Sequence, residues 1–85
     1  MMDVSDAILT DHALGQMSKR QIPDADVRRA LASPESVDPV RTGRVVAQAV
    51  VGEHLLRVFV DIDRDPPEVV TVYRTSKIDK YRSKP

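Results

Sequence analysis

The sequence predicts an α+β domain: two N-terminal helices packed on one face of a three-to-four-stranded antiparallel sheet, in the order α-α-β-β-β, and a short C-terminal helical turn. Three observations support this prediction. The chain of 85 residues is long enough for one hydrophobic core and too short for two. Apolar residues recur with helical spacing in its first third, and valine-rich alternating runs follow residue 43. We therefore expect one domain, residues 1–85, with an ordered core of about residues 8–81.

The first helix is expected from its cap. Thr10 or Asp11 can cap a helix that runs to about Arg20, after a loose N-terminus at residues 1–7. The apolar stripe of this helix is expected to be Leu9, Ala13, Leu14 and Met17.

A second helix follows a break at Ile22-Pro23. Proline is favoured at or near the first position of a helix, and Ser33-Pro34 is expected to end this one. Residues 34–43, which contain two prolines and a glycine, are expected to link the helix to the sheet. The expected buried side of the helix is Val27, Ala30 and Leu31.

A β-hairpin is expected at residues 44–51 and 54–62, because Gly52-Glu53 between them fits a type II′ turn. In this register one face is almost wholly apolar and is expected to pack on the helices. Its pairs are Val51–His54, Ala49–Leu56, Ala47–Val58 and Val45–Val60. The other face stays open, with the pairs Gln48–Arg57, Arg44–Asp61, Val46–Phe59 and Val50–Leu55.

A third strand is expected at residues 68–74. If Val70 and Val72 join the core, alternation puts Thr71, Tyr73 and Thr75 on the open face beside Gln48 and Arg57. Beyond this strand, Ser76 followed by Asp79 resembles a capping box and predicts the C-terminal helical turn.

Composition excludes several classes of function. There is no cysteine, so disulfides, thiol nucleophiles and zinc–thiolate sites are excluded. No apolar run is long enough for a membrane span or a signal peptide, so a cytoplasmic location is the expectation. The sequence also lacks a Gly-rich phosphate loop and a GxSxG elbow, which sets aside hydrolases of those kinds.

Two histidines and an aspartate run are the candidates for a chemical site. His12, in the first turn of the first helix, is a candidate general acid or base, and the alternative is a partly buried helix histidine. His54 is explained as a polar residue beside the hairpin turn. The run Asp61, Asp63 and Asp65 is rejected as a calcium loop because the later positions do not fit, and no metal site is expected.

Arginine is the more informative residue type. Arg41, Arg44, Arg57 and Arg74 lie on or beside the strands, where a rigid sheet can aim guanidinium groups at phosphate oxygens. For Arg44 an ion pair with Asp61 is the favoured interpretation, whereas Arg57 has no acid opposite it. Tyr73 beside them can stack on a base or donate a hydrogen bond.

Charge is balanced over the whole chain, with 13 basic and 13 acidic residues, but not along it. Residues 1–40 carry four basic groups against seven acids, and residues 41–85 carry nine against six. The two halves can attract one another within the fold, or leave a basic C-terminal surface for a polyanion. A solvated, lysine-rich tail remains the simpler interpretation.

Three segments resemble a small bacterial family, the domain of unknown function DUF4258. They are the run Asp11-His12-Ala13-Leu14…Met17…Lys19-Arg20-Gln21-Ile22, the arginine-led hairpin Arg44…Leu56-Arg57-Val58, and the ending Val70-Thr71-Val72-Tyr73-Arg74-Thr75-Ser76-Lys77…Lys80-Tyr81. The resemblance covers about residues 8–81. Gln21 departs from it, because the family usually has glycine in this turn.

The resemblance implies a relation to the RelE- and barnase-like ribonucleases of bacterial toxins, which carry helices on one face of an antiparallel sheet and cleave RNA on the other. It implies RNA or the ribosome as target, a cognate antitoxin protein as partner, and no metal or other cofactor. In such a mechanism the 2′-hydroxyl attacks the adjacent phosphate, a base accepts its proton and an arginine stabilises the developing charge. The implied catalytic residues are His12, Arg20, Arg57, Tyr73 and Thr75, and the implied nucleic-acid-binding residues are Arg44, Arg74, Lys77 and Lys80.

Two alternatives stay open. In the first, the chain is a non-catalytic module that binds nucleic acid or a protein; the absence of a complete histidine-and-base arrangement favours this alternative. In the second, the chain is a homodimeric relic of the toxin fold that has no catalytic activity.

Overall fold

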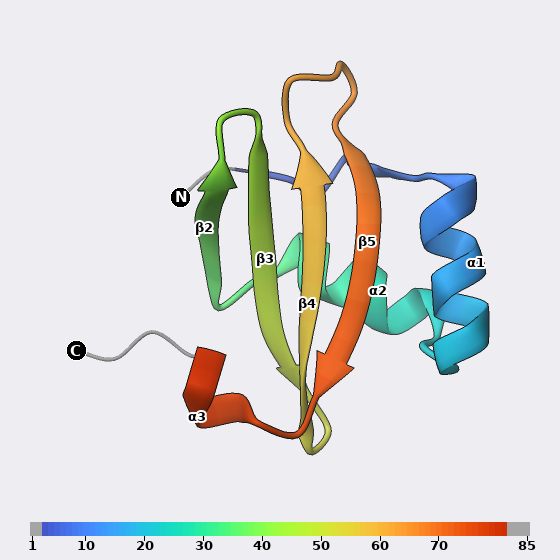
Figure 1. Ribbon diagram of the computed structural model, residues 1–85, viewed down its shortest axis with the longest axis vertical. Coiled ribbons are helices and arrows are strands. Elements are labelled where there is room, and N and C mark those ends of the chain that lie inside the picture. Colours follow the sequence, from blue (N-terminus) through green and yellow to red (C-terminus); the bar gives the residue numbers. More distant parts are fainter. Residues whose placement is uncertain (1–2, 82–85) are drawn as a thin grey trace.

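Residues 3–81 fold into a mixed sheet of five strands with three helices around it (Figure 1). This computed structural model describes residues 3–81. The elements are β1 (Ile8–Leu9), α1 (Asp11–Arg20), α2 (Asp24–Ala32), β2 (Ser36–Arg41), β3 (Arg44–Val51), β4 (His54–Asp61), β5 (Glu68–Thr75) and α3 (Ile78–Tyr81). The strand order is β1-β5-β4-β3-β2, in which only the pair of β1 and β5 is parallel. The α+β class is confirmed, but the expected three-to-four-stranded antiparallel sheet is corrected.

The two additional strands lie at the two edges of the sheet. β2 arises from the segment expected to be a linker, and it pairs with β3 along residues 36–41. Pro39 lies within it, which an edge strand tolerates because one side of its backbone has no ladder partner. β1 is only two residues long, which is too short for a periodic pattern in the sequence to predict it.

Helix α1 begins and ends where its sequence indicates. The Oγ1 atom of Thr10 accepts a hydrogen bond from the backbone N–H of Ala13 at 3.2 Å and caps the helix. At the other end Gln21 adopts a left-handed conformation with φ of 54°, and its N–H donates to the carbonyl of Ser18. This conformation turns the chain towards α2, which starts directly after Pro23 as expected.

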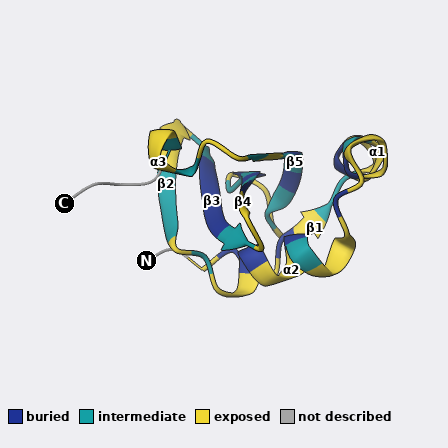
Figure 2. Ribbon diagram, turned by 90° about the horizontal axis from the view of Figure 1, so that it is seen from below, coloured by how far each residue is buried: buried dark blue, intermediate teal, exposed yellow. Residues whose placement is uncertain are grey.

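The helices do not share one face of the sheet. α2 packs against β3 and β4, whereas α1 lies along the edge of β5, beyond the two residues that pair with β1 (Figures 1 and 2). Figure 2 shows α3 on the face opposite α2. The expectation that both N-terminal helices pack on the same face is therefore corrected: α1 flanks the sheet at β5, with its buried Ala13 and Met17 joining the core, and α2 covers the inner face.

The β3–β4 hairpin has the expected register throughout, from Val51 opposite His54 to Arg44 opposite Asp61. Gly52 takes a φ of 64°, as a glycine at the first turn position requires. The register therefore places Gln48 beside Arg57 on the open face.

β5 contains an irregularity that the alternation pattern did not predict. Its pairing with β4 shifts at Phe59/Val60, so that Val69 and Val72 are both fully buried while Val70 is only half-buried. The expectation that Val70 joins the core is corrected. Beyond the shift, the three expected residues Thr71, Tyr73 and Thr75 lie opposite Phe59, Arg57 and Leu55.

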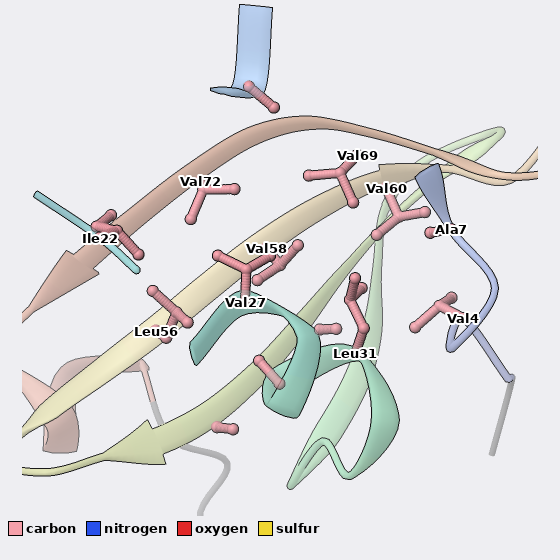
Figure 3. Packing of buried hydrophobic residues seen from close by; sticks show 14 of the residues in the cluster. Val4, Ala7, Ile22, Val27, Leu31, Leu56, Val58, Val60, Val69 and Val72 are labelled. Carbon is pink, nitrogen blue, oxygen red and sulfur yellow. The ribbon is translucent and has the colours of Figure 1, made fainter. Parts of the chain in front are cut away.

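The core lies between the sheet and α2 and is aliphatic (Figure 3). Its buried residues are Val4, Ala7, Ala13, Met17, Ile22, Val27, Ala30, Leu31, Val45, Ala47, Ala49, Leu56, Val58, Val60, Val69 and Val72. Val4 and Ala7 belong to it, which corrects the expectation of a loose segment for residues 3–7, whereas residues 1–2 lie outside the described residues. Leu14, expected on the buried stripe of α1, is 42% exposed. Among residues 3–81 no helix is long and apolar enough to cross a membrane.

Candidate functional site

Five side chains meet on the open face of the sheet, opposite α2. They are Gln48 of β3, Arg57 and Phe59 of β4, Tyr73 of β5 and Tyr81 of α3, and we call them the Arg57 cluster. Cross-strand pairing brings the first four together, because Arg57 lies between Gln48 and Tyr73 in the ladder. The short helix α3 then returns Tyr81 to the same face.

The guanidinium of Arg57 is held at two of its three nitrogens. Its Nε donates to the Oε1 atom of Gln48 at 2.7 Å, and its Nη1 donates to the hydroxyl of Tyr73. Within residues 3–81, no hydrogen bond engages the third nitrogen, Nη2. The two hydrogen bonds give this guanidinium a defined orientation, in which its Nη2 atom is unengaged.

Aromatic rings surround the same guanidinium. Its Cζ atom lies 4.3 Å from the ring centroid of Tyr81, 5.3 Å from that of Phe59 and 5.5 Å from that of Tyr73. Phe59 and Tyr73 stack at 6.0 Å, and Tyr81 meets Tyr73 edge-on at 6.4 Å. These distances are those of cation–π and aromatic pair interactions, which favour the charged guanidinium in this position.

Gln48 is the polar base of the cluster. It is only 2% exposed, and its amide is fully used. Its Nε2 donates to the Oγ atom of Ser36 at 3.2 Å and to the backbone carbonyl of Tyr81 at 3.1 Å, while its Oε1 accepts from Arg57. A buried amide with satisfied donors and acceptor has one stable orientation, so it fixes the position of Arg57 and ties α3 to the sheet.

The charge of Arg57 is not neutralised by a carboxylate: in the described part of the chain, none of the ion pairs includes it. The open face carries its ion pair elsewhere, between Arg44 and Asp61, at 2.6 Å from Nε to Oδ1. The hydrogen bond from Arg44 holds the pKa of Asp61 below its ordinary value, and the same bond raises the pKa of Arg44. Arg44 is also implied as a nucleic-acid-binding residue, but its guanidinium forms the ion pair with Asp61 that the strand register predicts.

The phenol of Tyr81 is also perturbed by its neighbours. A hydrogen bond from Tyr73 lowers the pKa of Tyr81, and the positive charges of Lys80 and Arg57 lower it further. The ammonium of Lys80 lies 5.3 Å from the ring of Tyr81. The cluster therefore contains a phenol that loses its proton more readily than an isolated tyrosine.

Of the five implied catalytic residues, the structure brings only Arg57 and Tyr73 into contact. Thr75 follows Tyr73 on the same face of β5, and its Oγ1 accepts a hydrogen bond from the backbone N–H of Lys77. Arg20 is turned to the edge of the sheet, where its Nη1 donates to the carbonyl of Val72 at 2.7 Å.

His12 is exposed on α1 and shares one face of that helix with Gln16 and Arg20, each one turn further along. Gln16 accepts from the N–H of Val72, and Arg20 donates to the carbonyl of the same residue. These two side chains replace the strand that β5 lacks at this point. His12 lies one turn before them, at the β5 edge, and no hydrogen bond joins it to the Arg57 cluster within the described residues.

The remaining implied nucleic-acid-binding residues are spread around the end of β5. Arg74 is exposed and donates to the carbonyl of Arg20, the last residue of α1. Lys77, directly before α3, and Lys80, within α3, are both exposed. Between residues 3 and 81 there is no group of three or more histidine, aspartate or glutamate residues that could hold a metal ion.

The sequence placed Gln48 and Phe59 on the open face without a role, and it offered Tyr81 only as the end of the C-terminal segment that resembles the family. One feature could have found all the ring residues: the chain has only one phenylalanine, two tyrosines and no tryptophan. Alternation already put two of these three rings on the open face.

Comparison with known proteins matches one family. Residues 9–74 match the family described as Domain of unknown function (DUF4258). Neither a curated protein nor a solved structure matches the chain.

Proposed function

This chain belongs to the family described as Domain of unknown function (DUF4258), and from that premise we propose that it binds RNA at Arg57 and cleaves it without a metal ion. The family description assigns no activity, so the proposal is supported by the residues of the Arg57 cluster.

The observation that carries the proposal is an oriented guanidinium without a carboxylate partner. Arg57 is fixed by Gln48 and Tyr73, presents Nη2, and carries a charge that no acid of residues 3–81 neutralises in an ion pair. Guanidinium groups match the oxygens of a phosphate, and a group that is already oriented loses little entropy when it binds. A phosphate is therefore the ligand that this site fits best.

The chemistry follows from placing a phosphodiester of RNA at Arg57. The 2′-oxygen forms a bond to phosphorus while the bond from phosphorus to the 5′-oxygen breaks, which leaves a cyclic 2′,3′-phosphate and a free 5′-hydroxyl. Arg57 stabilises the negative charge that develops on the non-bridging oxygens. The proton of the 2′-hydroxyl passes to a base and the leaving oxygen takes one up; the phenols of Tyr73 and Tyr81 are the proton-transfer groups of the cluster.

The experiment is cleavage of labelled RNA in the presence of EDTA. We expect the wild type to produce cyclic phosphate ends, and we expect Arg57→Lys to lose at least a factor of about 100 in rate, because lysine keeps the charge and loses the fork. Arg29→Lys is the matched control, since Arg29 is exposed on α2, which covers the other face of the sheet. Equal rates for Arg57→Lys and the wild type would contradict the proposal.

The second candidate is RNA binding by the same face without cleavage. The position of His12 favours it, because this histidine lies on α1 at the β5 edge and not in the Arg57 cluster. In that case the wild type binds RNA and Arg57→Lys weakens binding, but no cyclic phosphate forms. Loss of cleavage in His12→Ala at unchanged RNA affinity would instead return the role of base to His12.

A further inference from the structure

All the aromatic residues of this chain lie in one place. Its single phenylalanine and its two tyrosines are Phe59, Tyr73 and Tyr81, and each of these rings is within 5.5 Å of the Cζ atom of Arg57. The hydrophobic core, by contrast, consists of valine, leucine, isoleucine, alanine and methionine (Figure 3). Aromatic side chains have the largest apolar surface available for a core, yet this domain uses none of them there.

The contacts of the two tyrosines explain why they lie on the open face. The hydroxyl of Tyr73 accepts a hydrogen bond from Arg57. Tyr81 covers the guanidinium with its ring, and its backbone carbonyl accepts from Gln48. Phe59 has no hydroxyl, and it is only half-buried beside Arg57, a cation that forms no ion pair within residues 3–81. A partly exposed phenylalanine on the flat face of a sheet, next to the guanidinium that we propose binds phosphate, is an arrangement suited to a stacked base.

We infer that the Arg57 cluster takes single-stranded RNA, with one unpaired base stacked against Phe59 while Arg57 holds the adjacent phosphate. This inference rests on the proposed function and specifies its substrate class. A base in a duplex is already stacked between its neighbours and cannot reach a ring on a sheet without being extruded. The site therefore discriminates against double-stranded RNA.

The test measures binding with strands that cannot be cleaved. The wild type is titrated by fluorescence anisotropy with three ligands: a short single-stranded 2′-O-methyl RNA, the 2′-O-methyl duplex of the same sequence, and an abasic strand of 2′-O-methylribose phosphates of the same length. We expect the single strand to bind roughly tenfold more tightly than the duplex or the abasic strand, the size of one base–aromatic stack.

Variants of Phe59 assign the effect to the ring. Phe59→Leu keeps an apolar side chain of similar size, so the unfolding midpoint checks that the fold is retained. We expect this variant to lose roughly tenfold in affinity for the single strand and nothing for the abasic strand. Phe59→Tyr keeps a ring and is expected to retain wild-type affinity for both.

The outcomes separate this inference from the proposed function. Equal binding of single strand, duplex and abasic strand, or unchanged single-strand affinity in Phe59→Leu, would overturn the inference. If Arg57→Lys still weakens binding of all three, the phosphate site stands without the base site. If the wild type binds none of the strands, both proposals fail.

Discussion

The Nε atom of Arg57 lies 2.7 Å from the Oε1 atom of Gln48, a side chain that is only 2% exposed. This bond joins a cation on the open face to an amide buried within the sheet. Because the other end of the amide is held by Ser36 and by the backbone of Tyr81, the orientation of Arg57 is set by the fold. The proposed phosphate site is thus part of the sheet and requires no loop to close over it.

Replacing Gln48 is expected to weaken the fold and the site together. Gln48→Met keeps the shape of the side chain and removes its hydrogen bonds to Ser36, Arg57 and Tyr81. We expect the free energy of unfolding to fall by about 2 kcal/mol, the scale of a lost buried hydrogen-bond network. Urea denaturation followed by circular dichroism measures this, and a decrease below about 0.5 kcal/mol would show that the amide does not hold the cluster.

Arg20 is expected to stabilise the fold without taking part in RNA cleavage. Its Nη1 donates to the carbonyl of Val72 at the β5 edge, so Arg20→Met should lower the free energy of unfolding by about 1 kcal/mol. Lys19→Met, the neighbouring exposed position, is the matched control and should change little. Under conditions where both variants are folded, a cleavage rate lost only in Arg20→Met would show that Arg20 is catalytic after all.

Gln21 occupies a backbone position that suits glycine. With φ of 54° it is the only non-glycine residue of positive φ in the described chain. Glycine adopts this conformation without the steric cost that a Cβ atom brings, so Gln21→Gly should raise the free energy of unfolding by about 1 kcal/mol. Thermal unfolding measures the change, and a lower midpoint for the variant would contradict the left-handed C-cap.

The ion pair of Arg44 and Asp61 is expected to make the free energy of unfolding decrease at acidic pH. The hydrogen bond from Arg44 lowers the pKa of Asp61 in the folded state, so its contribution is present above the unfolded pKa, about 3.9, and is lost as pH falls through the lower folded pKa. Asp61→Asn should therefore show a shallower loss of stability below about pH 4 than the wild type. Parallel urea titrations across that range measure it, and identical slopes would mean that the pair does not act on stability.

The sequence was sufficient for those parts of the fold that local rules determine. The register of β3 and β4 is fixed by the two turn residues Gly52-Glu53 and by strict alternation, so every expected pair is present. The cap at Thr10 and the start of α2 after Pro23 depend on neighbouring backbone groups alone.

The parts that were missed depend on distant contacts. Pro39 favours a linker in the sequence, because proline is tolerated only in an edge strand and the sequence does not show which strand lies at an edge. Val70 lies outside the core because the pairing of β5 with β4 shifts, and that pairing is a long-range contact. The same holds for the site: alternation put Arg57 and Tyr73 on one face, but the return of Tyr81 over Arg57 is a tertiary contact of α3.

The most direct measurement of the central claim is a nuclear magnetic resonance titration of the labelled protein with a short single-stranded 2′-O-methyl RNA. We expect the largest shifts at the Nε–H of Arg57 and the side-chain amide of Gln48, because the phosphate adds its hydrogen bonds to that guanidinium. Shifts confined to Lys77, Lys80 and the end of β5, with Arg57 unchanged, would contradict it and assign binding to the basic C-terminal region alone.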